Sequence, residues 1–197
     1  MRTLIISAAI MLGLAVGGCE RGTESDEAPT PSTSTVVRPE TRVDTVPQEE
    51  PAVARSQWSA ANEAARTVTG NLRVSIEGNR GGPLIFAFAN GITVRAQPYE
   101  VAPADSRSGV GGQSFAAVLG GDPRVDVYLY RVLNENVTVS ATQGGLCGEA
   151  VARNLAVSEF VDGSGRWAFK LAAFRGEASP PSGADPVLCN SFAYTAQ

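Results

Sequence analysis

The sequence predicts a mostly β domain, an antiparallel sandwich or small barrel of about eight strands with one short N-terminal helix and one disulfide. Three observations predict this fold class. Apolar and polar side chains alternate in short segments, turn signals rich in glycine separate those segments, and no helix-length pattern falls between successive strands. The last observation disfavours a parallel sheet, whose strands need helical crossovers.

The helix is expected at the start of the folded domain. Ser59 can serve as the N-cap of a helix over residues 60–66, because its hydroxyl can accept a bond from a free backbone N–H of the first turn. Glu63 lies near the end of that helix where the dipole favours negative charge. Gly70 is expected to end the segment.

A hairpin follows the helix. Residues 72–76 alternate between apolar and polar side chains, which indicates a half-buried strand, and the continuously apolar residues 84–89 indicate an interior one. Asn90 and Gly91 form the dipeptide most typical of a tight hairpin turn. The next strand is therefore expected to run back over residues 92–96.

The rest of the domain continues as short apolar segments separated by turns. Gly-Gly-Asp-Pro at residues 120–123 and Asp-Gly-Ser-Gly at residues 162–165 are turn signals. Residues 125–132 are apolar on both faces, which is typical of a strand covered on both sides. The strands expected in this part lie at residues 115–119, 125–132, 137–139, 155–157, 167–171 and 188–194.

The N-terminus has the layout of an export signal. Met1-Arg2-Thr3 is a short positive start, and residues 4–16 are apolar except for Ser7, a run of 13 residues. As a helix this run would span roughly 20 Å, less than the ~30 Å hydrocarbon core of a bilayer. Residues 1–18 are therefore predicted to be a signal peptide rather than a permanent membrane span.

The end of this run, Val-Gly-Gly-Cys at residues 16–19, resembles the lipobox of bacterial lipoproteins. The resemblance implies cleavage before Cys19, a diacylglyceryl thioether on its sulfur and acylation of its new amino group. Two or three acyl chains hold a protein stably on a membrane, so the lipid bilayer is the expected partner. The resemblance also implies a periplasm-facing protein of the cell envelope. Glu20, in place of an aspartate, favours the outer over the inner membrane.

Residues 19–57 are predicted to be the lipidated cysteine and a disordered tether. After Cys19 this segment holds five prolines, ten serines or threonines, eight acidic and four basic side chains, with no apolar periodicity. Such a composition cannot bury enough apolar surface to offset the entropy lost on ordering. Its random-coil span is roughly 30–35 Å, so it acts as a spacer between the bilayer and the globular domain of residues 58–197.

Cysteine use predicts one disulfide. The chain has three cysteines, and with Cys19 lipidated only Cys147 and Cys189 remain to pair. An exported protein lies in an oxidising compartment, which favours the bond. No CxxC spacing is present, so this pair is expected to be structural rather than catalytic.

Composition excludes several classes of function. The chain has no histidine, which removes Ser–His and Cys–His triads and histidine-ligated zinc or haem. The folded domain has 12 acidic and 11 basic side chains, so its charge gives no support for nucleic-acid binding. No cofactor and no metal site are expected, and the domain is expected to be non-catalytic.

The remaining routes to catalysis are weak in this sequence. Lys170 is the single lysine of the domain, and no SxxK or GxSxG motif is present, although a Ser–Lys pair could assemble across space. Ser164 lies in a predicted turn. The acidic residues Asp122, Asp126 and Asp162 do not have the dense spacing of a calcium loop. The glycine-rich residues 109–112 lack the GxGxxG spacing of a phosphate-binding loop.

Aromatic side chains at strand spacing suggest either a cavity or a core. Tyr128 and Tyr130 share one strand face, as do Phe86 and Phe88, and together they could line an apolar cavity for a ligand. Filling the hydrophobic core is the favoured alternative for these four residues.

Two further resemblances concern the folded domain. Ser108-Gly109, in a loop before Phe115, resembles the Ser-Gly loop of the periplasmic lysozyme inhibitors, but the tyrosine of that loop is absent and the cysteines are placed differently. Gly-Leu-Cys-Gly at residues 145–148 and Leu-Cys-Asn-Ser-Phe-Ala-Tyr at residues 188–194 resemble uncharacterised proteobacterial envelope lipoproteins, a similarity that implies no activity.

These observations lead to one expected function and two alternatives. The expected function is a membrane-anchored envelope module that binds or scaffolds another envelope component. The first alternative is an inhibitor of a hydrolase such as lysozyme, acting through residues 109–115. The second is a histidine-free hydrolase that uses Lys170 or carboxylates.

Overall fold

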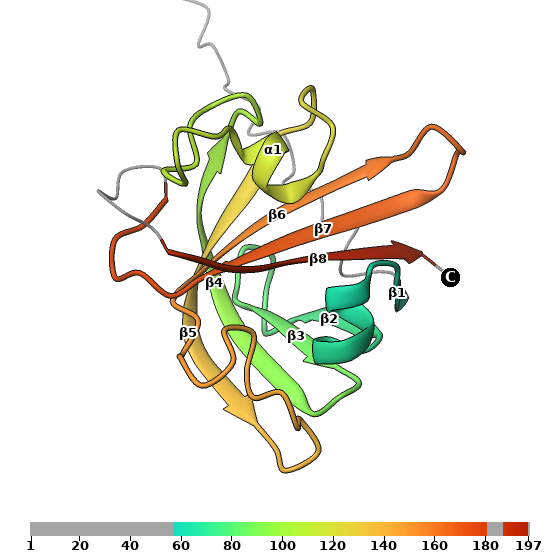
Figure 1. The fold of residues 1–197 in the computed structure, drawn as a ribbon, viewed down its shortest axis with the longest axis vertical. Helices are drawn as coiled ribbons and strands as arrows, with labels where there is room; N and C mark the ends of the chain where they lie inside the picture. The colour runs from blue at the N-terminus through green and yellow to red at the C-terminus, as the bar shows by residue number, and fades with distance from the viewer. Residues whose placement is uncertain (1–56, 181–186, 197) are drawn as a thin grey trace, which may run out of the picture. The chain divides into compact units, whose positions relative to one another are not determined.

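The structure is a computed structural model, and it describes residues 57–180 and 187–196. In these ranges eight antiparallel strands follow one another around a closed barrel, each paired with its neighbours in the chain (Figure 1). The strands are β1 (Gln57–Ala60), β2 (Leu72–Ile76), β3 (Leu84–Phe88), β4 (Ile92–Ala102), β5 (Val127–Val137), β6 (Asn154–Val161), β7 (Trp167–Phe174) and β8 (Leu188–Ala196). The mostly β fold is confirmed, and of the two predicted forms the barrel is the one adopted.

The shortest strand closes the barrel. In β1, Trp58 pairs with Leu72 of β2 on one side and with Ala196 of β8 on the other. The sequence predicts the start of a helix at these residues, and that prediction is wrong. Since β8 and β2 would otherwise both present unpaired backbone groups, pairing with them takes residues 57–60 into a strand.

The N-terminal helix exists but begins later than predicted. It includes the π-helical turn η2 (Ala65–Thr69) and ends at Gly70, whose φ is 67°. The cap is Asn62 rather than Ser59, because the Asn62 side-chain oxygen accepts a bond of 3.0 Å from the Ala65 N–H. The same oxygen accepts from the Ala193 N–H at 3.1 Å, which joins the helix to β8.

The hairpin between β3 and β4 is confirmed, with a longer loop than the Asn-Gly signal suggests. The Phe88 carbonyl accepts from the Gly91 N–H at 3.1 Å, so Ala89 and Asn90 occupy the centre of the turn. Gly91 follows with a φ of 92°, a conformation that favours glycine. This is the three-residue type of hairpin loop, in which glycine occupies the left-handed position.

Residues 115–119, predicted as a strand, form the helix α1 (Phe115–Leu119). The Ser114 hydroxyl caps it by accepting from the Ala117 N–H at 3.3 Å, and Gly120 ends it with a φ of 59°. A five-residue apolar run has no periodicity that separates strand from helix, which explains the error. Turn signals, in contrast, were informative: Asp162 and Gly165 close the predicted β6–β7 turn through a 2.9 Å backbone bond.

The barrel interior is the main hydrophobic core, and it draws residues from all eight strands. Aromatic rings dominate this core. The ring centroids of Trp58 and Phe169 are 5.3 Å apart, and those of Phe169 and Tyr194 are 5.8 Å apart. The Tyr194 hydroxyl is satisfied by the Thr69 hydroxyl at 2.7 Å. Burial raises the pKa of Tyr194 well above its usual value. The interior is therefore packed by side chains, as small barrels usually are.

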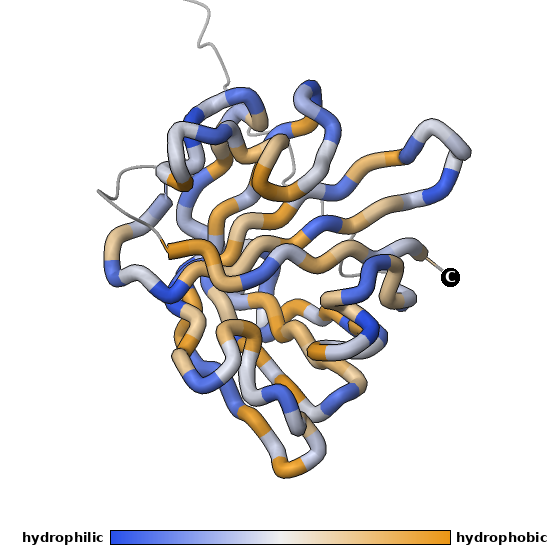
Figure 2. The backbone as a smooth tube through the Cα atoms, viewed as in Figure 1, coloured by the Kyte–Doolittle hydropathy of each residue, from blue (hydrophilic) through white to orange (hydrophobic). Residues whose placement is uncertain are grey.

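A second apolar cluster lies on the outer face of the barrel. Phe115, Val118 and Leu119 of α1 pack on residues of β5, β6 and β7, and Phe115 is fully buried. In Figure 1 α1 lies over these strands near one end of the barrel, and Figure 2 shows the apolar residues along that stretch of the chain. Strands β6 and β7 are thus covered on both faces, which explains their nearly unbroken burial.

Candidate functional site

The described residues hold part of the predicted site. Cys19, the predicted signal peptide and the predicted tether lie outside the described ranges, apart from Gln57, which opens β1. In the described ranges no helix has the length and apolar content that crossing a membrane requires.

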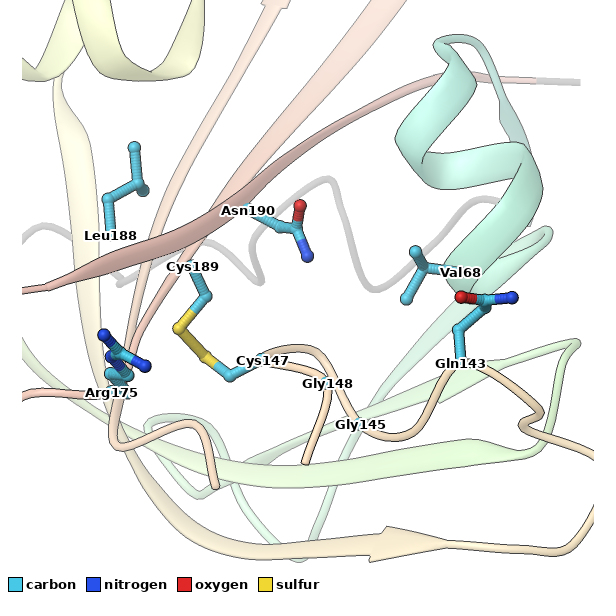
Figure 3. A pocket seen from close by; sticks show the side chains of 9 residues that line it. All are labelled: Val68, Gln143, Gly145, Cys147, Gly148, Arg175, Leu188, Cys189 and Asn190. Carbon is cyan, nitrogen blue, oxygen red and sulfur yellow. A yellow bond between two sulfur atoms is a disulfide. The ribbon is translucent and has the colours of Figure 1, made fainter. Parts of the chain in front are cut away.

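The predicted disulfide is present. Cys147, in the loop between β5 and β6, is bonded to Cys189 of β8, with 5.0 Å between the two Cα atoms. Figure 3 shows the bond at the wall of a pocket of about 410 Å³, between the loop and β8. The described lining residues are Val68, Gln143, Gly145, Cys147, Gly148, Arg175, Leu188, Cys189 and Asn190.

One carboxylate organises the loop that carries Cys147. Glu135 of β5 accepts bonds from the backbone N–H of Leu146 at 2.7 Å and of Ala152 at 2.9 Å, one with each oxygen. The Asn190 amide donates to the Leu146 carbonyl at 3.1 Å, which holds the same loop from β8. A Cβ at Gly144 would lie 2.5 Å from the Gly148 carbonyl oxygen, so the loop also needs glycine there.

The described residues that line the pocket carry few charged or reactive groups. Of the described residues that line it, Arg175 alone is charged, and it lies at the end of the pocket opposite Gln143 (Figure 3). These lining residues include neither a hydroxyl or thiol nucleophile nor a carboxylate, so they form no nucleophile–base pair. The arrangement can hold a small polar group against the disulfide.

The structure brings one serine and Lys170 together. Ser158 of β6 lies directly opposite Lys170 of β7 in the register, on the outer face covered by α1. The Ser158 hydroxyl is buried and has no hydrogen-bond partner, Lys170 included. It lies next to Gly121, where an added Cβ would be 3.8 Å from the hydroxyl oxygen. A substrate cannot reach this oxygen in the present conformation.

Asp122 and Asp162 each accept hydrogen bonds within a turn. Asp122 accepts from the Arg124 guanidinium at 2.7 and 3.0 Å, and hydrogen bonding by Arg124 holds its pKa at about 2. Asp162 accepts from the Ser164 hydroxyl at 2.5 Å, and the bonds from Ser164 and the Arg166 N–H hold its pKa at about 2. No group of three metal-ligating side chains occurs within the described ranges.

The glycine-rich loop is held by its own hydrogen bonds. Ser108 is fully buried, and both its N–H and its hydroxyl donate to the Gln113 carbonyl, at 2.9 and 2.8 Å. Phe115, the end of the loop assigned to hydrolase inhibition, is buried at the start of α1. Only the tip of that loop, around residues 111–113, is exposed.

The four aromatic residues do not line one cavity. Phe86, Phe88 and Tyr130 are at most 5% exposed and belong to the core. Phe86 packs edge-on against Tyr130, with 5.8 Å between the ring centroids. Tyr128 is 37% exposed near the start of β5. The core alternative therefore holds for three of the four.

Sequence reasoning missed Glu135 and Asn62. Glu135 bonds a backbone group 17 residues away, and Asn62 bonds one 131 residues away. No local sequence pattern marks such a residue.

Comparison of the chain with protein-family models, with curated protein sequences and with solved structures finds no match.

Proposed function

We propose that this chain is a lipid-anchored envelope protein whose β barrel is a non-catalytic module that binds or scaffolds another envelope component. The observation that carries the proposal is the order of sequence features at the N-terminus: a positive start, an apolar run of 13 residues, Val-Gly-Gly-Cys ending at Cys19, and then the polar segment that leads to β1. Glu20 after Cys19 favours the outer membrane.

The described residues support a binding rather than a catalytic role. Packed rings occupy the barrel interior, and the pocket beside Cys147–Cys189 offers a cation and amides without a nucleophile–base pair. Ser158 lies opposite Lys170 in the strand register. Its hydroxyl is buried, on the outer face of the barrel where α1 packs.

Lipid anchoring is tested by labelling the full-length protein with radioactive palmitate in a bacterial host and fractionating the cells. We expect label on the wild type and recovery in the membrane fraction after a carbonate wash, and neither result for Cys19→Ser. Cys147→Ser together with Cys189→Ser is the matched control, because it removes the two disulfide-bonded cysteines and leaves Cys19 in place. Equal labelling of wild type and Cys19→Ser would contradict the anchor.

The binding role is tested by crosslinking in intact envelopes, purifying the protein and identifying its neighbours by mass spectrometry. We expect neighbours that are absent when an unrelated lipoprotein on the same tether is purified in parallel. A neighbour list that does not differ between the two would count against a specific partner.

A further inference from the structure

The inner face of the β6–β7 hairpin changes from buried to exposed at its outer end. Along this face Val157 and Leu171 are a directly opposed pair, and both are at most 1% exposed. At the end next to the turn, Val161 and Trp167 are also directly opposed, and they are 51% and 46% exposed. Figure 1 shows this hairpin reaching out from the barrel.

The exposed pair lies at the end of the barrel where the chain enters. In the register, Ala168 of β7 pairs with Thr195 of β8, and Ala196 of β8 pairs with Trp58 of β1. Trp167 is therefore about 10 Å, or two strand spacings, from the first residues of β1. The chain that precedes Gln57 includes the segment predicted to carry the lipid.

The turn beyond the pair carries balanced charge. Asp162 and Arg166 form an ion pair of 3.6 Å. The Asp162 carboxylate also accepts hydrogen bonds from the backbone N–H groups of Ser164 and Arg166. The charge of Asp162 is thus compensated within the turn, and Glu159 is a further acidic side chain on the same face, between Val157 and Val161. An indole has an apolar body and a polar N–H, and such side chains collect at the interface between a bilayer and water.

We propose that Trp167 and Val161 form a membrane-interface contact that seats the β1 end of the barrel on a phospholipid surface. The inference rests on the proposed lipid anchor, because two side chains bind a bilayer weakly. The proposed anchor would keep the hairpin at high effective concentration near the membrane, which allows a weak contact to be occupied.

The test uses the two tryptophans of the chain. Full-length mature lipoprotein is reconstituted in vesicles of phosphatidylethanolamine and phosphatidylglycerol, with or without bromine on the acyl chains near the headgroup. Bromine quenches only tryptophans that reach the bilayer. Trp58 is 1% exposed inside the barrel and serves as the internal reference.

We expect brominated lipid to lower the Trp167 emission roughly twofold, as for an indole at the interface. That emission is measured in Trp58→Phe, or as the difference between wild type and Trp167→Phe if Trp58→Phe does not fold. Trp167→Phe itself should show no quenching, because its remaining indole is in the core.

Flotation of the same vesicles separates this inference from the proposed anchor. Protein that floats with the vesicles while Trp167 is unquenched overturns the contact and leaves the anchor standing. Protein that does not float overturns both. Trp167 that is protected from aqueous acrylamide yet unquenched by bromolipid is covered by protein, a second copy included, which also overturns the lipid contact.

Discussion

Glu135 shows how a single side chain can position a whole loop. Its two oxygens accept the Leu146 and Ala152 N–H groups, so two backbone donors are satisfied on either side of Cys147. A Cβ at Gly145 would lie 2.5 Å from one of these oxygens, so the loop approaches Glu135 closely. The shape of the pocket beside the disulfide therefore depends on this carboxylate.

Glu135→Gln is expected to lower the free energy of unfolding by about 1–3 kcal/mol, because one carboxylate oxygen is replaced by an amide nitrogen that cannot accept a backbone N–H. Urea unfolding followed by circular dichroism measures the change. Glu149→Gln is the matched control, since Glu149 is exposed in the same loop. Equal losses in the two variants would show that Glu135 has no special role.

Asn62 has a comparable role beside the middle of β8. Its side-chain oxygen accepts from Ala65 and Ala193, and its amide donates to the Ser191 carbonyl at 3.0 Å. One amide thus caps the helix and fixes that helix on the last strand. This explains why the helix begins after residue 62 rather than at Ser59.

Among the described strands, β8 is the one that a disulfide joins to a neighbouring loop. It pairs with β7 over most of its length but with β1 at only three positions, and its first half faces the disulfide loop. The Cys147–Cys189 bond and the Asn190 amide hold this half against the loop. The predicted Cys147–Cys189 bond therefore links the last strand to the loop between β5 and β6.

Replacing both Cys147 and Cys189 with alanine is expected to cost about 4 kcal/mol in unfolding free energy, from the entropy of an unfolded chain no longer closed by the bond. Amide hydrogen exchange should increase most at residues 188–191, where β8 loses its link to the loop. Chemical unfolding and exchange mass spectrometry measure the two effects. Exchange that increases equally in β3 would indicate general loosening instead.

The helix α1 illustrates how an element is decided by its surroundings. Phe115 is fully buried, and Val118 and Leu119 are at most 8% exposed, all on the outer face of β5–β7. This helix has only five residues and would not be stable alone, because helix nucleation is costly. Packing on the sheet and the caps at Ser114 and Gly120 hold it.

At the scale of the molecule, the barrel depends on Trp58. This residue belongs to the four-residue strand that joins β8 to β2, and its ring packs against Phe169 across the interior. Closing the sheet removes its free edges, which would otherwise be sites for association with other chains.

Trp58→Ala is expected to lower the free energy of unfolding by about 3–5 kcal/mol, as for a large core side chain replaced by alanine. Trp167→Ala is the matched control and should cost about 1 kcal/mol or less, the range of a cross-strand pair contact. Thermal and urea unfolding measure both. Similar losses for the two variants would mean that Trp58 does not hold the closure.

The strand pattern could be predicted because it is local. Residues 72–76 are recovered as β2 without change, and the predicted interior strand at residues 84–89 differs from β3 by one residue. The candidate site was predictable only in its cysteines, since elimination left Cys147 and Cys189 as partners. Glu135, Asn190 and Arg175 meet them through pairing of distant segments, which no spacing in the sequence encodes.

By itself the sequence determined a mostly β domain, most of its strands and its disulfide, because alternation along a strand and a count of thiols are properties of the chain alone. Tertiary structure decided between sandwich and barrel, turned residues 57–60 into a strand and residues 115–119 into a helix, and exposed Trp167 at the rim. Closure requires that β1 meet β8 across more than 130 positions of sequence. Such a contact is stabilised by edges and surfaces that exist only once the rest of the barrel has formed.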